Sequence, residues 1–303
     1  MTSTVKIYQR QNSVIYHGDC LEALECLDDN SIDLIFADPP YNIGKKFGTF
    51  LDFWKTDLEY LDWCYQWLSL CIKKLKSSGS LYIMTSTQAM PYIDIWLRDK
   101  MIVLSRIIWH YDSSGVQAKK YYGSLYEPIL FAVKDPKNYT FNASDIEIEA
   151  KTGATRQLID YRKQVPTPYK TTKLPGNAWY YPRVRYRMAE YEEHPTQKPE
   201  AMLERIIKAS SNVGDTVLDP FSGTFTTSAV ADRLKRNNIG IELQEEYLKI
   251  GLRRLKILDK YNDEYLKPIQ KNNIIRNGTR KKMDLYYSRM LYGYNYNIST
   301  SIY

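Results

Sequence analysis

Cysteine and histidine are scarce in this chain of 303 residues, which has four of the first and three of the second. No two cysteines form a Cys-x-x-Cys pair, and no cluster of histidines lies near any of them. Zinc sites and disulfide frameworks depend on such spacings. The sequence therefore predicts neither a bound metal nor a structural disulfide.

Long apolar stretches are also missing. The first 11 residues lack the apolar core of a signal peptide, and no uninterrupted apolar run reaches the length of a membrane-spanning helix. We therefore expect a cytoplasmic protein.

Two glycine-rich phosphate-binding motifs are absent as well. Without GxGxxG an NAD site is disfavoured, and without GxxxxGK[ST] there is no P-loop. These absences narrow the nucleotide-binding folds that the chain can have.

Tyrosine and positive charge are abundant by contrast. There are 27 Tyr against 8 Phe and 6 Trp, and the formal net charge is +7. Tyrosine suits wet surfaces that meet bases or phosphates, although the codon bias of an AT-rich genome explains its frequency equally well. Positive charge suits a polyanionic partner. The length fits one large domain or a domain with an insertion.

Hydrophobic periodicity predicts alternating strands and helices, which favours an α/β sheet with helices on both faces. Strands are expected over residues 14–16, 32–37, 80–84, 103–111, 128–134, 216–218 and 239–242. Helices are expected over residues 20–27, 58–75, 90–100, 199–210, 225–234 and 245–258, with a glycine-containing loop at 44–48.

The predicted domain organisation has four parts. Residues 1–134 and 194–262 form two halves of one domain, and the irregular residues 135–193 form an inserted recognition region. Residues 263–303 are basic and then rich in Tyr and Asn. We expect part of this last segment to be poorly ordered.

The quartet Asp38-Pro39-Pro40-Tyr41 follows the apolar strand at residues 32–37. Open α/β sheets bind ligands at the carboxyl ends of their strands. The quartet offers a carboxylate, a backbone carbonyl and an aromatic face, which is the set that a flipped-out nucleobase with an exocyclic amine requires. The alternative is that Asp38-Pro39 forms an ordinary turn that ends the strand and has no catalytic role.

A second pattern runs from Gly214 to Phe225, where a strand leads through a Ser-Gly turn into a helix. Such a turn places backbone amides and a helix amino end beside a ligand. Glu242 ends the following predicted strand, where an acid can accept hydrogen bonds from ribose hydroxyls. The structural alternative is an ordinary turn with a solvent-facing glutamate.

Two further candidates have complete structural alternatives. In His194-Pro195-Thr196-Gln197-Lys198-Pro199, Thr196 or Gln197 would cap the next helix, with Pro199 in its first turn. The functional alternative places Thr196 and Lys198 near a charged group of a cofactor. Asp19 either completes a turn or accepts a hydrogen bond from an adenine amine.

Taken together and in this order, these motifs resemble the β group of DNA amino-methyltransferases, in which the catalytic motif precedes the cofactor motif and the target-recognition region lies between them. The resemblance covers about residues 14–258 and is carried by the four motifs above. It implies a Rossmann-like S-adenosylmethionine-dependent methyltransferase fold with circularly permuted motif order. The stretches 111–120, 123–130 and 183–186 are similar to those of the YhdJ-type orphan adenine methyltransferases, which implies the target ATGCAT.

The resemblance implies S-adenosyl-L-methionine as cofactor, double-stranded DNA as substrate, and no metal. A homodimer is left open. The implied catalytic residues are Asp38, Pro39, Pro40 and Tyr41. The implied cofactor-binding residues are Asp19, Cys20, Thr196, Lys198, Asp219, Pro220, Phe221, Ser222, Gly223, Thr224 and Glu242. The implied assignment gives Asp19 to the adenine, Glu242 to the ribose, and residues 219–224 with Thr196 and Lys198 to the methionine end. One departure is Phe225, which replaces a glycine common in the β group, and its side chain is expected to narrow the cofactor turn.

The expected chemistry begins with the adenine amine donating both hydrogens, to Asp38 and to the Pro39 carbonyl, so that its lone pair points at the methyl group. Tyr41 would stack on the flipped base. Candidates for DNA contact are Lys119, Lys120, Arg183, Arg185 and Arg187. A solvated basic surface is the alternative for each of these five.

Three rival functions remain at this stage. Cytosine-N4 methylation uses the same fold, but a serine in place of Asp38 is more typical there. RNA methylation is a weaker rival, and a catalytically silent DNA-binding regulator is opposed by the intact Asp38, Tyr41 and Glu242.

Overall fold

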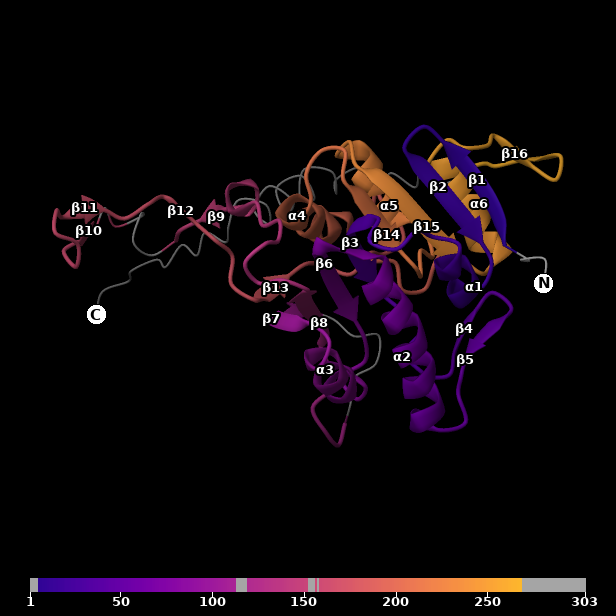
Figure 1. Cartoon of the computed structure of the whole chain (residues 1–303), viewed down its shortest axis with the longest axis horizontal. Helices are drawn as coiled ribbons and strands as arrows, with labels where there is room; N and C mark the ends of the chain where they lie inside the picture. The colour runs from indigo at the N-terminus through magenta and orange to yellow at the C-terminus, as the bar shows by residue number, and fades with distance from the viewer. Residues whose placement is uncertain (1–4, 113–118, 152–155, 157, 269–303) are drawn as a thin grey trace, which may run out of the picture. The chain divides into compact units, whose positions relative to one another are not determined.

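A twisted sheet of nine strands forms the centre of the computed structural model, which describes residues 5–112, 119–151, 156 and 158–268 (Figure 1). In spatial order the strands are β1 (Lys6–Arg10), β2 (Ser13–His17), β15 (Asn237–Glu242), β14 (Thr216–Asp219), β3 (Ile32–Ala37), β6 (Leu75–Met84), β8 (Tyr126–Val133), β7 (Ile102–His110) and β13 (Ala178–Tyr180). The five strands from β2 to β6 are parallel, β8 is antiparallel to both of its neighbours, and β1 is antiparallel to β2.

Helices cover both faces of this sheet, as predicted. They are α1 (Cys20–Glu25), α2 (Asp57–Lys74), α3 (Met90–Arg98), α4 (Glu200–Ser210), α5 (Thr226–Arg233) and α6 (Glu245–Arg254). Ile35 of β3 packs in one core with α1, α2 and α3, whereas Leu34 and Phe36 pack in a second core with α4 and α5. Alternate residues of one strand thus pack in opposite layers, which explains why β3 is apolar except at Asp33.

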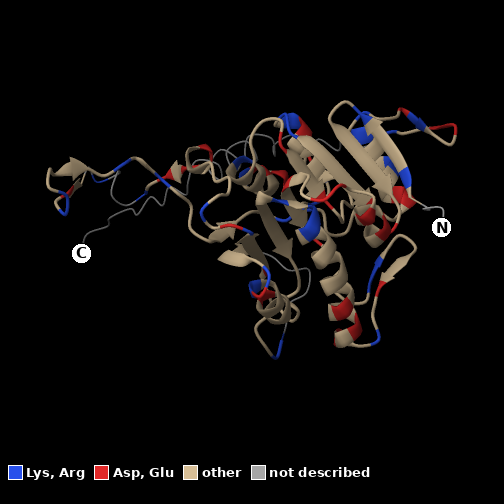
Figure 2. Ribbon diagram, viewed as in Figure 1, with Lys and Arg blue, Asp and Glu red and all other residues tan. Residues whose placement is uncertain are grey.

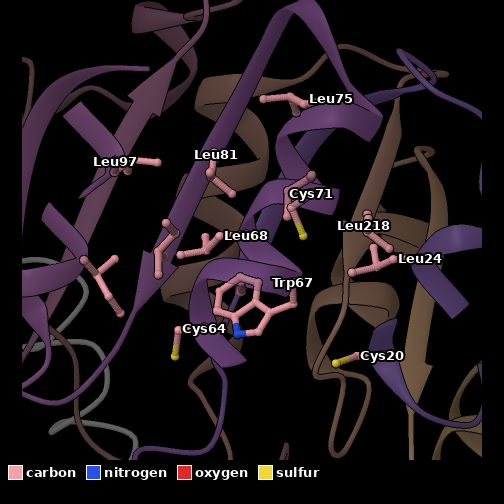
Figure 3. Packing of buried hydrophobic residues seen from close by; sticks show 14 of the residues in the cluster. Cys20, Leu24, Cys64, Trp67, Leu68, Cys71, Leu75, Leu81, Leu97 and Leu218 are labelled. Atoms are coloured by element: carbon pink, nitrogen blue, oxygen red, sulfur yellow. The ribbon is translucent and has the colours of Figure 1, made fainter. Parts of the chain in front are cut away.

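The core against α2 is dense with large side chains. Figure 3 shows Trp67, Leu68 and Cys71 of this helix packed among leucines of the sheet. Trp67 is fully buried. The four cysteines of the chain, three of which contribute to this core, are all free in the structure.

Two predicted element boundaries are wrong. Strand β6 was expected to begin at residue 80, but helix α2 passes directly into it at Leu75, where ψ becomes 133°. The loop expected at 44–48 is a hairpin of β4 (Lys45–Phe47) and β5 (Phe50–Asp52). Gly48, with φ +58°, supplies the left-handed residue of its two-residue turn.

The irregular middle of the chain forms short pieces of structure. These are η1 (Ala143–Ile146), β9 (Ile148–Glu149), β10 (Ile159–Asp160), β11 (Thr167–Pro168) and β12 (Thr172–Lys173), of which β10 pairs with β11 and β9 with β12. Two small hairpins, β4–β5 and β16 (Lys260–Tyr261) with β17 (Glu264–Tyr265), complete the described strands. Residues up to Pro268 form one compact unit, and the predicted disordered tail lies mostly outside the described residues. No helix in the described ranges is long and apolar enough to cross a membrane.

The order of the strands creates a binding crevice between β14 and β3. The next strand of this sheet after β14 in the chain, β15, lies on one side of the crevice, and the next strand of this sheet after β3, β6, lies on the other side. Where connections leave in opposite directions, a crevice opens outside the carboxyl ends of the two strands. The quartet after β3 and the turn after β14 both reach this crevice.

Candidate active site and cofactor pocket

A cavity of about 440 Å³ lies at this crevice. Its walls include all fifteen residues that the sequence assigned to catalysis or to the cofactor, from Asp19 to Glu242. Segments that are far apart in the chain thus line one hollow of the size that small-molecule sites have.

Asp38 is engaged by two donors in this structure. Its Oδ1 accepts a hydrogen bond of 2.6 Å from the Tyr41 hydroxyl, and its Oδ2 accepts one of 2.5 Å from Lys198 Nζ. Lys198 also donates to the carbonyl of Thr196 at 3.2 Å. Burial alone would lower the pKa of Lys198, but the carboxylates of Asp38 and Glu127 outweigh burial and raise it. The lysine is therefore a fixed positive charge beside Asp38.

Glu127, which lies in the stretch 123–130 but was assigned no role from the sequence, also lines this cavity. Glu127 is the second residue of β8. Its Oε2 lies 3.1 Å from the Tyr41 hydroxyl and 3.8 Å from Lys198 Nζ. The expected role of Tyr41 was stacking, whereas its hydroxyl here meets two carboxylates. Burial, followed by the charges of Asp38 and Glu127, raises the pKa of Tyr41 well above its usual range.

A second missed acid, Asp52, holds the backbone that follows the quartet. This fully buried carboxylate accepts hydrogen bonds from three successive backbone amides, those of Tyr41, Asn42 and Ile43, at 3.2, 2.6 and 3.3 Å. Successive amides that converge on one anion form a nest. Since Asp52 ends β5, the hairpin fixes the loop that carries Tyr41.

Glu242 closes the opposite end of the cavity. Its two carboxylate oxygens accept the amides of Gly223 at 2.8 Å and Gln244 at 2.7 Å. Burial raises the pKa of Glu242 to about 7 despite these two bonds. The turn after β14 and the end of β15 are thus joined through one buried acid.

Asp219, at the end of β14, is another buried acid that lines the cavity. It accepts hydrogen bonds from Thr227 Oγ1 at 2.5 Å and from the amide of Phe221 at 3.0 Å. Burial raises its pKa to about 7. Neither Asp219 nor Glu242 forms an ion pair with any residue that the structure describes. Two buried acids without a cationic partner fit a ligand that brings positive charge and hydroxyl donors.

Asp19 has a structural role at the start of α1, where it is the N-cap residue. Its side chain caps α1 by accepting the amides of Leu21 at 2.8 Å and Glu22 at 3.4 Å. Asp19 and Cys20 nevertheless line the cavity, so an additional contact with a ligand remains a prediction.

The predicted cap of α4 is wrong. Pro199 itself is the N-cap residue and no side chain of Thr196 or Gln197 caps the helix. The amide of Glu200 instead donates to Glu190 Oε2 at 2.7 Å. The side chain of Gln197 stabilises the preceding loop, because its Nε2 donates a hydrogen bond to the carbonyl of Glu190 at 2.6 Å.

His194 is a further residue of this wall that was not assigned a role. Its ring lies 4.5 Å from that of Tyr247, centroid to centroid, and packs against Gly223, whose φ is +50°. Burial, with the nearby charges of Lys198 and Lys45, lowers its pKa to about 3. The ring is therefore a neutral wall of the cavity and not a proton donor at physiological pH.

Phe225 does not narrow the cofactor turn, which corrects the prediction. It adopts the left-handed conformation, with φ 57°, as the N-cap residue of α5, and its fully buried ring is absent from the cavity wall. The ring fills a slot left by Gly240 and Gly251, at either of which a Cβ would approach it within 2.7 Å. The side chain thus supports the turn from the core.

The five candidates for DNA contact divide into two kinds. Lys119, Lys120, Arg185 and Arg187 are exposed, whereas Arg183 is half-buried, lines the cavity and lies 5.3 Å from the Tyr111 ring. Figure 2 shows that Lys and Arg are spread over many elements rather than gathered on one of them. Residues 113–118 of the resemblance lie outside the described part of the chain.

The sheet order, the permuted motifs and the cavity that they share define a Rossmann-like methyltransferase. A family of DNA methylases, the N6/N4 methyltransferases, matches residues 32–253, and the chain belongs to this family. The expected fold and permuted motif order are thereby confirmed.

Individual relatives agree with this membership. The chain is 57% identical over 264 residues to DNA adenine methyltransferase YhdJ of Escherichia coli strain K12, with 87% of this chain and 90% of the relative covered. It is 38% identical to type II methyltransferase M.HpaI of Haemophilus parainfluenzae, with 78% and 72% covered.

Solved structures give the same fold. PvuII DNA methyltransferase, described as cytosine-N4-specific, superposes with a TM-score of 0.63 at 19% identity and covers 95% of each chain. The M1.HpyAVI–SAM complex superposes with a TM-score of 0.52 at 27% identity, with 79% of this chain and 98% of the other covered.

Proposed function

We propose that this chain methylates the N6 of adenine in double-stranded DNA after flipping the base from the helix. S-adenosyl-L-methionine is the methyl donor. The observation that supports the proposal most directly is the cavity in which Asp38, at the end of β3, faces the turn and acid at the ends of β14 and β15. The 57% identity to a DNA adenine methyltransferase supports adenine as the base.

The cofactor would occupy the part of the cavity bounded by Asp19, Cys20, Glu242 and the turn at residues 219–224. We assign Glu242 to ribose hydroxyls, Asp19 to the adenine, and the turn with Thr196 to the methionine end. The bound cofactor supplies an electrophilic methyl group on a sulfonium. Lys198, predicted for the methionine end, lies against Asp38 instead, so we assign it to the catalytic acid.

Asp38 would orient the target amine. An aromatic amine is a weak nucleophile because its lone pair is delocalised into the ring. Hydrogen bonds from both amine hydrogens, to Asp38 and to the carbonyl of Pro39, would favour a tetrahedral nitrogen whose lone pair is available. Holding the reactants in line would supply much of the acceleration. Stacking on the Tyr41 ring would offset part of the cost of flipping, which is a few kcal/mol.

The remaining assignments concern the whole enzyme. We propose residues 135–193 as the target-recognition region, between catalytic and cofactor halves at residues 1–134 and 194–262. ATGCAT is proposed as the target on the likeness of the stretches quoted above. A cytoplasmic location follows from the proposed substrate, and the homodimer stays a prediction that light scattering can check.

Transfer of a labelled methyl group tests the function. The wild-type protein is expected to label adenine in duplex DNA, and Asp38→Ala to abolish labelling while calorimetry still detects cofactor binding. Retained turnover in Asp38→Ala would contradict its role. Label on cytosine would favour the rival N4 activity. Modification-sensitive sequencing of DNA from expressing cells then gives the base and its sequence context together.

A further inference from the structure

The hydroxyl of Tyr41 lies between two carboxylates. It is 2.6 Å from Asp38 Oδ1 and 3.1 Å from Glu127 Oε2. A phenol has one hydrogen to donate. When both acids are ionised, only one of these contacts is a hydrogen bond, and the other brings two oxygen lone pairs together. One additional proton in the cluster makes both contacts hydrogen bonds.

The surroundings hold this arrangement in place. Asp38, Tyr41 and Glu127 come from the end of β3, the loop after it and the start of β8, and Lys198 lies against both acids. The side chains of Asp38 and Glu127 are 16% and 20% exposed, so little solvent competes for their protons. Besides Asp38, Tyr41, Glu127 and Lys198 themselves, the titratable or charged groups that act on this cluster are Lys45, Tyr111, Arg183 and Asp219.

We propose that Glu127 is the final acceptor of the proton that the target amine loses, and that the Tyr41 hydroxyl relays it there from Asp38. This inference rests on the proposed function and adds a proton pathway to it. It assigns a reaction role to an acid that lies 89 residues after Asp38 in the chain and belongs to none of the motifs.

The step balances in protons and electrons. The amine lone pair forms the new N–C bond while the C–S bond breaks and its electron pair stays on sulfur. The nitrogen then carries one proton too many. An N–H bond breaks, its electrons return to nitrogen, and the proton passes to Asp38. Tyr41 takes that proton on its oxygen as it gives its own to Glu127, so the phenol and Asp38 are restored.

Single-turnover transfer to duplex DNA tests the relay. Glu127→Gln keeps the shape of the side chain but cannot accept the proton, so we expect a loss of about 100-fold in rate, in the range of general-base contributions. The KM for DNA, the cofactor affinity and the melting temperature should change little. Glu127→Asp should recover part of the rate. Tyr41→Phe, which keeps the ring, should match Glu127→Gln.

Chemical rescue separates proton transfer from support of the loop. Formate should restore part of the rate to Glu127→Ala, and the rate of that variant should rise with pH as hydroxide replaces the missing base. Glu204→Gln, on α4 and paired with Arg233, is the matched control and should behave as the wild type.

Different failures point to different assignments. An unchanged rate in Glu127→Gln would overturn the relay, as would a loss that formate and Glu127→Asp leave uncorrected. Either result leaves the proposed function intact when the wild type labels adenine. A wild type that labels no adenine contradicts the proposed function itself.

Discussion

Burial, more than any neighbouring charge, controls the two acids on the cofactor side of the cavity. Glu242 and Asp219 both have pKa values raised to about 7 because they are buried. Both acids therefore take up a proton more readily near neutral pH than an ordinary carboxyl group does. A ligand that donates hydrogen bonds or carries positive charge favours their ionised forms.

Cofactor affinity should consequently depend on pH. Below pH 7 the cofactor must displace a proton before it can use Glu242, and above pH 7 no such cost remains. One group of this pKa gives a dissociation constant that falls roughly tenfold between pH 6 and pH 8 and then levels off. Calorimetry at several pH values measures this change, and it should also detect proton release at pH 7.

Glu242→Gln is the decisive variant for that pH dependence. It should weaken binding at pH 8 and reduce the pH slope, leaving the part due to Asp219. Glu264→Gln, an exposed acid in the β16–β17 hairpin, serves as control. An unchanged dissociation constant in Glu242→Gln would contradict its assignment to the ribose.

At the scale of elements, the hairpin β4–β5 stabilises the catalytic loop through Asp52. Asp52→Asn keeps the size of the side chain but replaces an acceptor oxygen with an NH₂ group, which faces backbone amides. We expect a loss of about 1–3 kcal/mol in stability and roughly tenfold in kcat. Thermal denaturation and initial rates measure both. Asp62→Asn, exposed on α2, should change neither, and a fully active Asp52→Asn would disprove the positioning role.

The packing of Phe225 gives a second prediction at this scale. Phe225→Ala leaves a cavity between β15 and α6 and should lower the free energy of unfolding by about 3–5 kcal/mol. Cofactor affinity, measured at a temperature where the variant is folded, should change less than threefold because the ring faces away from the site. A large loss of affinity with unchanged stability would mean that Phe225 forms part of the cofactor site after all.

At the scale of the molecule, DNA binding should separate the exposed basic residues from Arg183. If Lys120 contacts a phosphate, Lys120→Ala should reduce the slope of log K against log salt by about 1. Arg183→Ala should instead lower turnover or relax sequence choice, since Arg183 lines the cavity. Lys73→Ala is the control, because Lys73 pairs with Asp29 at the far end of α2. If the salt dependence of binding is the same in Lys120→Ala as in the wild type, Lys120 does not contact a phosphate and its charge is exposed to solvent.

The same scale explains how far the sequence could predict this molecule. Burial on both sides leaves a run that is apolar except at Asp33, so β3 was predicted with both of its ends correct. The motifs after β3, β14 and β15 could be predicted to lie close together, because parallel neighbouring strands have their carboxyl ends at the same edge of the sheet. Glu127, Asp52 and the Glu190 cap were missed because their partners are 86, 9 to 11 and 10 residues away, and no local pattern records such contacts.

The β4–β5 hairpin has two attachments only three residues apart. At its turn, the amide and hydroxyl of Thr49 both donate to Gln244 Oε1, at 3.0 and 2.7 Å, beside Glu242. At its end, Asp52 holds the amides that follow the quartet. The hairpin therefore joins the end of β15 to the backbone that follows β3, so both sides of the cavity share one support.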